Sequence, residues 1–154
     1  MPGNAENFLS DAWSHSVLAA DTLTSYLQDL ETAAAAGRNL MTEKYARMEN
    51  LIPSLNENEL IYKIVDIERK WLSEVHKKYP LTIAVEGGFT TYAVCELETY
   101  SDATLNLYYR DIFLAATQKR NLVEERYQYL YGNLGFKDLE EVEALAQKRA
   151  AVKE

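Results

Sequence analysis

The sequence predicts an all-α fold, an antiparallel helical bundle built from an internally duplicated helical unit. Three observations predict it. Apolar residues recur every three to four positions over long segments, only six Gly and three Pro interrupt the 154 residues, and two segments match each other position by position. That spacing is the period of an amphipathic helix. A composition of 47% apolar and 26% charged residues is typical of one folded domain, so we treat residues 1–154 as a single helical domain.

The clearest helical segment runs from about Asp21, a suitable N-cap, to Met48. Gly37 lies on its apolar stripe. Since Gly inside a helix costs about 1 kcal/mol relative to Ala, we expect Gly37 to admit a neighbouring helix or a ligand closely. The alternative is that the helix ends near Gly37.

Other segments with the same periodicity predict further helices. They span residues 57–79, 89–98, 102–131 and 138–152, and a short helix from about Phe8 precedes the first long one. Asn56 with Glu59 three residues later predicts a capping box, and Pro80 is expected to close the helix that this box opens.

An internal repeat is the most informative feature of the chain. Sliding the sequence by 82 positions aligns residues 22–48 with 104–130 and gives 11 identities in 27 positions. Helical periodicity explains the matching Leu and Ala, but it does not explain matching polar residues. These are Asp29/Asp111, Arg38/Arg120, Asn39/Asn121 and Glu43/Glu125. We therefore interpret the pattern as a duplication, with units of about residues 8–51 and 57–134 packed about a pseudo-two-fold axis that brings equivalent residues together.

The two units differ in one helix. The segment 57–79 opens the second unit and has no counterpart in front of the first. The apolar surface that such a helix would cover must be hidden by a partner chain, covered by the C-terminal helix, or left open as a pocket. We expect a homodimer.

Charge and composition exclude several classes of partner. With 16 Lys and Arg against 24 Asp and Glu, the net charge is −8, which disfavours nucleic acid and anionic membranes. No stretch approaches the length of a membrane span, and no signal peptide is evident. The single cysteine, Cys95, cannot form an internal disulfide. We therefore expect a cytoplasmic protein.

Specific motifs give the chain a family resemblance. The motifs are Tyr26-Leu27-Gln28-Asp29-Leu30, Gly37-Arg38-Asn39-Leu40-Met41-Thr42-Glu43-Lys44-Tyr45-Ala46-Arg47-Met48, Lys78-Tyr79-Pro80, Glu96-Leu97 with Thr99-Tyr100-Ser101, and Gly135-Phe136-Lys137-Asp138-Leu139-Glu140-Glu141. Together they resemble the signature of the family called domain of unknown function 4125, and the resemblance extends over most of the chain from Phe8. It implies a duplicated helical architecture and no established reaction.

The chain also departs from that family's pattern. It looks cut short at the front, without the family's opening helix and a Cys-containing polar motif. Ala12 or Trp13 and Ser14-His15 stand where the family tends to have an Arg and a Ser-Gln pair.

Helical phase places three polar side chains on otherwise apolar faces: Glu68, Glu96 and His15. Buried carboxylates are costly unless neutralised or paired. Aligning Phe8 with Phe89 sets His15 opposite Glu96, so the duplicated arrangement could bring an imidazole and a carboxylate together to work as a general base. The alternative is a capping or surface role for His15.

In that alternative, Glu96 pairs with Arg120 or Lys119. The repeated polar residues likewise admit two interpretations. They form a structural network along and between the helices, or Arg38 and Arg120 form a fork for an anionic substrate group. Tyrosine is frequent, at 11 residues against four Phe. It indicates either a pocket for a small molecule or an amphipathic dimer seam.

The leading functional hypothesis is a cofactor-independent enzyme of accessory or specialised metabolism, doing acid–base chemistry of isomerase, cyclase or lyase type on a small molecule. The expected catalytic residues are His15, Glu96 and Glu68, and the expected substrate-binding residues are Arg38, Arg120, Tyr26, Tyr108, Asn39 and Asn121. No Glu-x-x-His pairs, phosphate-binding Gly loop or zinc-type spacing is present, so no metal or cofactor is expected. The alternative is a non-catalytic helical dimerisation or accessory module, whose polar residues saturate one another.

Overall fold

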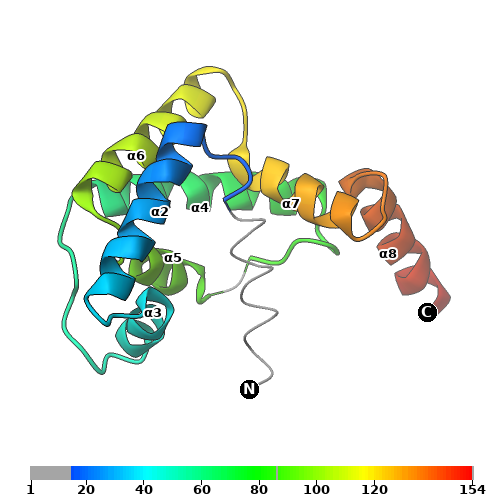
Figure 1. The fold of residues 1–154 in the computed structure, drawn as a ribbon. Helices are drawn as coiled ribbons and strands as arrows, with labels where there is room; N and C mark the ends of the chain where they lie inside the picture. Colours follow the sequence, from blue (N-terminus) through cyan, green and yellow to red (C-terminus); the bar gives the residue numbers. More distant parts are fainter. Residues whose placement is uncertain (1–14, 86, 154) are drawn as a thin grey trace. The chain divides into compact units, whose positions relative to one another are not determined.

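The computed structural model describes residues 15–85 and 87–153, which form helices and no strand (Figure 1). The helices are α2 (Ala20–Ala35), α3 (Leu40–Met48), α4 (Leu60–Lys78), α5 (Phe89–Leu97), α6 (Asp102–Thr117), α7 (Leu122–Asn133) and α8 (Leu139–Lys153). The all-α prediction is confirmed. The expected short helix from Phe8 lies outside the described residues.

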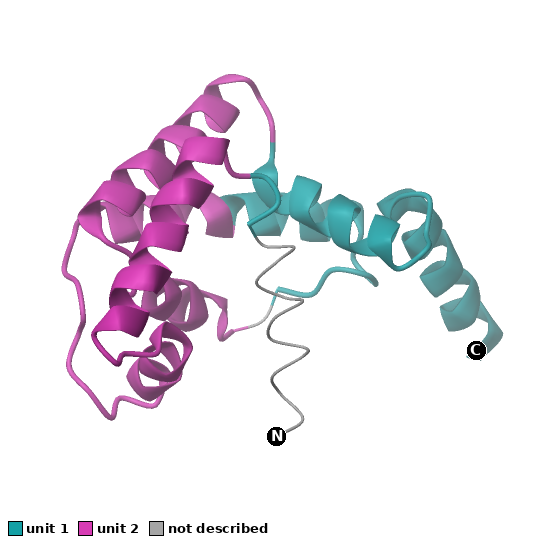
Figure 2. Ribbon diagram, in the orientation of Figure 1, with its two compact units in different colours: residues 1–17, 70–85, 121–154 teal, residues 18–69, 86–120 magenta. Residues whose placement is uncertain are grey.

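The chain forms two compact units (Figure 2). Unit 1 consists of residues 1–17, 70–85 and 121–154, and unit 2 of residues 18–69 and 86–120. These boundaries do not follow the predicted repeat, because α3 belongs to unit 2 while α7, which stands 82 residues later, belongs to unit 1. The duplication stays a prediction.

Helices α2 and α6 lie side by side in unit 2 and run in opposite directions (Figure 1). An Asp two thirds along each helix accepts the backbone N–H that precedes the other helix. Asp111 accepts from Ala19, and Asp29 accepts from Ser101, both at 2.9 Å. Helix α3 packs on α5 in the same unit. The polar groups discussed below come from these four helices, from α4 and from the adjoining loops.

Both long helices predicted from the sequence are interrupted. The predictions of continuous helices over 21–48 and 102–131 are wrong, and the alternative of a helix end near Gly37 is correct. Gly37 has a φ of 72°, and Lys119, 82 residues later, has a φ of 57°. At each end the next residue's N–H bonds to a carbonyl five residues back: Arg38 to Ala33 at 2.8 Å and Arg120 to Ala115 at 2.9 Å. This is the left-handed helix ending that favours glycine.

Gly37 therefore has a different use from the one expected. A Cβ atom added at Gly37 would meet nothing within 4 Å, so the predicted close approach of a neighbouring helix is not found among the described residues, and the approach of a ligand stays a prediction. The helix that follows begins at an Asn in both places. Asn39 accepts the N–H of Thr42, and Asn121 accepts the N–H of Glu124. Such caps satisfy donors that the first helical turn leaves open.

Unit 1 holds α8 against α7 and against the residues that follow α4. The Tyr79 hydroxyl donates to Glu140 at 2.5 Å. Glu143 is buried and accepts the N–H groups of Leu81 and Thr82 at 3.0 and 2.9 Å. In the described part of the chain, no helix has the length and apolar character needed to cross a membrane.

Candidate functional site

Three tyrosine rings form a cluster inside unit 2. The Tyr100 ring lies 4.8 Å from the Tyr26 ring and 6.1 Å from the Tyr108 ring, measured between centroids. We call these three residues the tyrosine cluster. Two of the tyrosine hydroxyls donate hydrogen bonds to carboxylates. Tyr108 donates to Glu68 at 2.5 Å, and Tyr100 donates to Glu96 at 3.1 Å. Tyr100, Tyr108 and Glu68 are buried, and buried hydroxyls need such partners.

A buried lysine completes the network. Lys44 is 1% exposed, and its Nζ lies 2.9 Å from Glu96 Oε2. The same Nζ donates to the Tyr92 hydroxyl at 3.2 Å and lies 4.7 Å from the centroid of that ring. The Glu96 side chain is 17% exposed, so this end of the network is the more accessible one. Lys44 comes from α3 while Tyr92 and Glu96 come from α5, so the contacts join the two helices.

Electrostatics in this network fix the protons firmly. Burial alone would lower the pKa of Lys44, but the Glu96 carboxylate and the Tyr92 hydroxyl outweigh it and hold that pKa above its ordinary value. Burial and the nearby Glu96 carboxylate raise the pKa of Tyr100 well above 10. Both groups thus keep their protons at neutral pH. A group that exchanges protons efficiently has a pKa near the working pH, so these shifts favour a structural role for both.

The structure brings several predicted site residues together. Glu68, Glu96, Tyr26 and Tyr108 all belong to the network around the tyrosine cluster. The cationic partner found for Glu96 is Lys44. His15 lies in a turn of unit 1, whereas Glu96 lies in unit 2. The contact predicted between them stays a prediction.

The repeated Arg residues do not converge. The Arg38 guanidinium donates twice to the Glu43 carboxylate, at 2.8 Å each, and the Arg38 side chain is half exposed. Arg38 follows the end of α2 and Arg120 follows the end of α6. Because these helices run in opposite directions, the two residues lie at opposite ends of the pair, on the order of 25 Å apart at 1.5 Å per helical residue. One clamp built from both Arg residues is excluded.

The repeated Asn residues act at helix starts. Besides capping α7, Asn121 donates from its side-chain amide to the Trp71 carbonyl at 3.0 Å. Asn39 caps α3 in the same manner as Asn121 caps α7. These contacts give both residues a structural task, and the substrate-binding role predicted for them stays a prediction.

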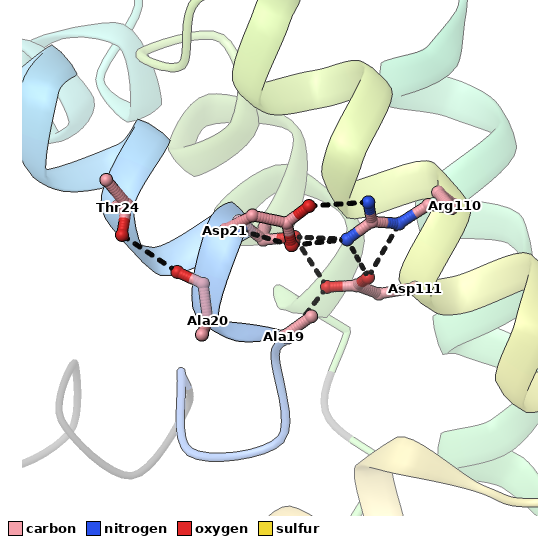
Figure 3. Close-up of polar contacts among 7 residues, drawn as sticks. Ala19, Ala20, Asp21, Thr24, Arg110 and Asp111 are labelled. Atoms are coloured by element: carbon pink, nitrogen blue, oxygen red, sulfur yellow. Dashed lines mark hydrogen bonds and ion pairs between the residues drawn. The ribbon is translucent and has the colours of Figure 1, made fainter.

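The repeated Asp residues bind backbone across the α2 and α6 pair. Figure 3 shows the contacts of Asp111. Asp111 Oδ2 accepts the Ala19 N–H and also the Thr22 hydroxyl, at 2.7 Å. Arg110 pairs with Asp111 and, through two guanidinium nitrogens, with Asp21. These contacts secure the starts of the two helices.

Glu98 forms a second buried polar centre in unit 2. It is 4% exposed, and its Oε1 accepts from Arg47 at 3.0 Å, from Ser54 at 2.6 Å and from the Leu55 N–H at 3.0 Å. Among the described residues, Oε2 has no hydrogen-bond partner. Glu98 thereby fixes the segment between α3 and α4. Burial and the Glu98 carboxylate raise the pKa of the Cys95 thiol, which disfavours a nucleophilic role for it.

Lys44 is the residue that sequence reasoning missed. Two signals could have found it. It lies four residues after Leu40 and four before Met48, in phase with an apolar stripe. Its counterpart 82 residues later, Arg126, is also basic and also buried. A cation that recurs on an apolar face predicts a buried partner of opposite charge.

One face of α2 is apolar and exposed. Leu23, Leu27 and Leu30 follow each other at helical spacing and are 37%, 53% and 37% exposed. We call these three residues the α2 outer stripe. Their counterparts 82 residues later lie on α6, where Leu105 and Ile112 are fully buried and Tyr109 is half-buried. The same positions are therefore covered on one helix and open on the other.

Across the described residues, no three His, Cys, Asp or Glu side chains gather as a metal-binding group.

The comparisons with known proteins identify the family. A family model described as a protein of unknown function, DUF4125, matches residues 9–144. Neither the curated proteins nor the solved structures give a match. Since the family match spans far more than half of the 154 residues, the chain belongs to the DUF4125 family.

Proposed function

We propose that this chain is a helix-binding module whose contact surface is the α2 outer stripe. One observation carries the proposal: Leu23 and Leu30 are each 37% exposed, while Leu105 and Ile112 at the equivalent positions of α6 are 0% exposed. The face has the spacing with which one helix packs on another. An exposed apolar row of this kind marks an interaction surface.

The energy available is suited to a reversible contact. Fully burying a leucine side chain contributes about 1.5–3 kcal/mol relative to exposing it. Three leucines that are already partly covered therefore offer on the order of 2–3 kcal/mol. Further contacts at the edges of the stripe would add to this, as at other helix-in-groove interfaces.

The polar interior supports a structural assignment. The carboxylates predicted to be catalytic are occupied within unit 2, Glu68 by Tyr108 and Glu96 by Lys44 and Tyr100. Mutual saturation of polar residues is what the non-catalytic alternative predicts. The raised pKa values of Lys44 and Tyr100 point the same way.

Photo-crosslinking in the native host tests the proposal. A photoreactive residue is placed at position 27, and a matched one at position 114, where Leu114 has a similar exposure of 48% against 53% for Leu27. Crosslinks to a second chain are expected at position 27 and not at position 114. Equal crosslinking at the two positions, or none at position 27, contradicts the proposal. A mass of twice the monomer would identify the partner as a second copy, the homodimer predicted from the sequence.

A second candidate function is acid–base catalysis on a small molecule. The observation that favours it is the pairing of two carboxylates with two tyrosine hydroxyls around one ring cluster, with Glu96 partly exposed. Buried titratable clusters of this kind also occur at active sites.

Deuterium exchange tests the second candidate. Small carboxylic acids with acidic C–H bonds are incubated with the protein in D2O, and NMR follows exchange. Catalysed exchange that falls about 10²–10⁴-fold in Glu96→Gln, and persists in Leu27→Glu, would support catalysis. If neither Glu96→Gln nor His15→Ala changes the exchange rate, the predicted proton-transfer roles of Glu96 and His15 are contradicted.

A further inference from the structure

Glu98 has one carboxylate oxygen that is buried and lacks a hydrogen bond. Its Oε1 accepts three hydrogen bonds, from Arg47, Ser54 and the Leu55 N–H. Among the described residues, its Oε2 accepts none, although Glu98 is only 4% exposed. A buried polar atom without a partner is costly, and native structures seldom leave one. The free oxygen therefore points to a donor that comes from outside the described residues.

Arg47 has unused donors beside this oxygen. A single hydrogen bond, from Arg47 Nε to Glu98 Oε1 at 3.0 Å, joins the two residues. In the described part of the chain, the two terminal guanidinium nitrogens of Arg47 donate to no other group. Arg38 and Glu43 show the saturated arrangement, in which two guanidinium nitrogens bond to two carboxylate oxygens, at 2.8 Å each. The pair of Arg47 and Glu98 thus keeps both donors and an acceptor for a third molecule.

We propose that Arg47 and Glu98 bind a free α-amino acid. Its ammonium group donates to Glu98 Oε2, and its carboxylate accepts from the terminal nitrogens of Arg47. A zwitterion fits this pair better than a simple cation or anion does. Because Arg47 and Glu98 already balance each other's charge, a ligand with only one charge would leave a charge uncompensated in a buried place.

The segment between α3 and α4 closes over Glu98. We call residues 49–59 the strap. The strap contains no helix, and none of its side chains is buried. Hydrogen bonds attach it to the residues after α5: Ser54 donates to Glu98 at 2.6 Å, and Asn58 donates to Asp102 at 2.9 Å. A segment held by polar bonds and no buried side chain opens at low cost. An amino acid enters when the strap opens and is enclosed when it closes again.

Thermal unfolding of the full-length chain tests the proposal. Each of the twenty common L-amino acids is added separately, and the Tm is compared with that of the chain alone. A Kd of about 1 mM or lower is expected from two charge-assisted contacts. At about ten times that Kd, the bound amino acid should raise the Tm by about 3–6 °C. Hydrogen exchange of strap amides should slow under the same conditions.

Derivatives of the amino acid with the largest shift test both contacts. The N-acetyl derivative has no ammonium group, and the carboxamide has no carboxylate. Calorimetric titration should show that each binds at least tenfold more weakly than the parent amino acid. Equal binding of either derivative would overturn the zwitterion assignment.

Matched variants locate the site. Glu98→Gln replaces the free acceptor by an N–H donor, and Arg47→Lys keeps the charge but removes the terminal guanidinium nitrogens. Each should weaken binding at least tenfold. Glu43→Gln makes the same change in the saturated pair and should alter binding less than twofold. If Glu98→Gln does not fold, Arg47→Lys decides, because the Arg47 side chain is 21% exposed and tolerates replacement better.

Three results would overturn the proposal. They are a Tm that none of the twenty amino acids raises, binding that survives Arg47→Lys unchanged, and a crystal structure, grown with the amino acids, in which only water lies on Glu98 Oε2. The site is independent of the α2 outer stripe. Leu27→Glu should therefore leave amino-acid binding unchanged, and loss of the crosslinks at position 27 would not affect this inference.

Discussion

Lys119 holds a backbone conformation that normally belongs to glycine. Its φ of 57° matches the 72° of Gly37 at the equivalent end of α2. An L-residue in the left-handed region costs about 1 kcal/mol or more, because its Cβ crowds the following carbonyl. Nothing lies within 4 Å of a Cβ atom at Gly37, so backbone strain, and not crowding by neighbours, decides which residues Gly37 can be replaced by.

Exchanging the two residue types should move stability in opposite directions. Lys119→Gly is expected to raise the free energy of unfolding by about 0.5–1 kcal/mol, after the entropy that Gly costs is deducted. Gly37→Ala should lower it by about 1 kcal/mol. Urea unfolding measures both. Lys119→Ala is the control, because it removes the charge and keeps the strain. If Lys119→Gly proves no more stable than Lys119→Ala, the strain argument fails.

For single residues, the sequence predicts which polar side chains are buried better than it predicts their contact partners. The apolar phase of Glu68 predicts a buried carboxylate, and Glu68 is 5% exposed. Its partner, Tyr108, comes from 40 positions away. Lys44 and Glu96 are 52 positions apart, and only the packing of α3 on α5 brings them within 2.9 Å. Such pairings depend on tertiary structure, which periodicity does not encode.

The pairing of α2 with α6 rests on reciprocal side-chain to backbone bonds. Each helix supplies an Asp that accepts the N–H at the start of the other. Asp111 does more than Asp29, since it also accepts the Thr22 hydroxyl and pairs with Arg110. Thr22 is fully buried, so its hydroxyl needs that acceptor.

Removing the two Asp side chains should therefore have unequal effects. Asp111→Ala is expected to lower the free energy of unfolding by about 2–3 kcal/mol, because it leaves the buried Thr22 hydroxyl without its acceptor. Asp29→Ala is expected to lower it by about 1 kcal/mol, because it removes a helix cap. Glu31→Ala, an exposed acidic residue on the same helix as Asp29, should change it by less than about 0.5 kcal/mol. Chemical denaturation gives all three values. Equal costs for Asp111 and Glu31 would contradict this account.

Helix existence was predictable, and helix ends only in part. The run Ala33-Ala34-Ala35-Ala36 and the absence of Gly near Lys119 hide both interruptions, because alanine is the strongest helix former and lysine gives no stop signal. Asn39 and Asn121 were available as N-cap signals for α3 and α7. The recurrence of these two Asn residues is also compatible with a polar network, so the sequence alone does not identify two helix starts.

Stability differs between parts of the whole molecule, and α8 is an example. Of its residues only Leu139 and Glu143 are buried, and Val152 is 86% exposed. Its attachment in unit 1 includes two carboxylates. The hydrogen bond from Tyr79 lowers the pKa of Glu140. Burial alone would raise the pKa of Glu143, but bonds from Gln147, Thr82 and the Leu81 N–H outweigh it and lower that pKa.

Acid should therefore release α8 before the rest of the chain unfolds. A carboxylate whose pKa is lowered in the folded state stabilises fully above its unfolded value of about 4.3, and the stabilisation is lost as pH falls through the folded value. Hydrogen exchange of α8 amides should accelerate between about pH 5 and pH 3. In Glu143→Gln exchange should be faster at pH 7 and less dependent on pH. Protection that stays constant down to pH 3 would refute the assignment.

For the whole chain, composition and periodicity were enough for the all-α class, and the motifs were enough for the family. A shared centre for Arg38 and Arg120 was not found, because the direction of α6 relative to α2 separates their ends. The relative direction of α2 and α6 depends on contacts between residues more than 70 positions apart in the sequence. No local sequence pattern indicates the relative direction of two helices.

The same long connections bear on how the protein is made. Ala19 and Asp111 are 92 positions apart, so the first turn of α2 has no Asp111 acceptor until nearly three quarters of the chain has been synthesised. At about 5–20 residues per second, that interval is roughly 5–20 s. During this interval the leucines of α2 have left the ribosome, while α6, which stabilises α2, is not yet complete. A nascent chain stalled before codon 111 should therefore bind holdase chaperones through this segment, and release them once α6 is complete.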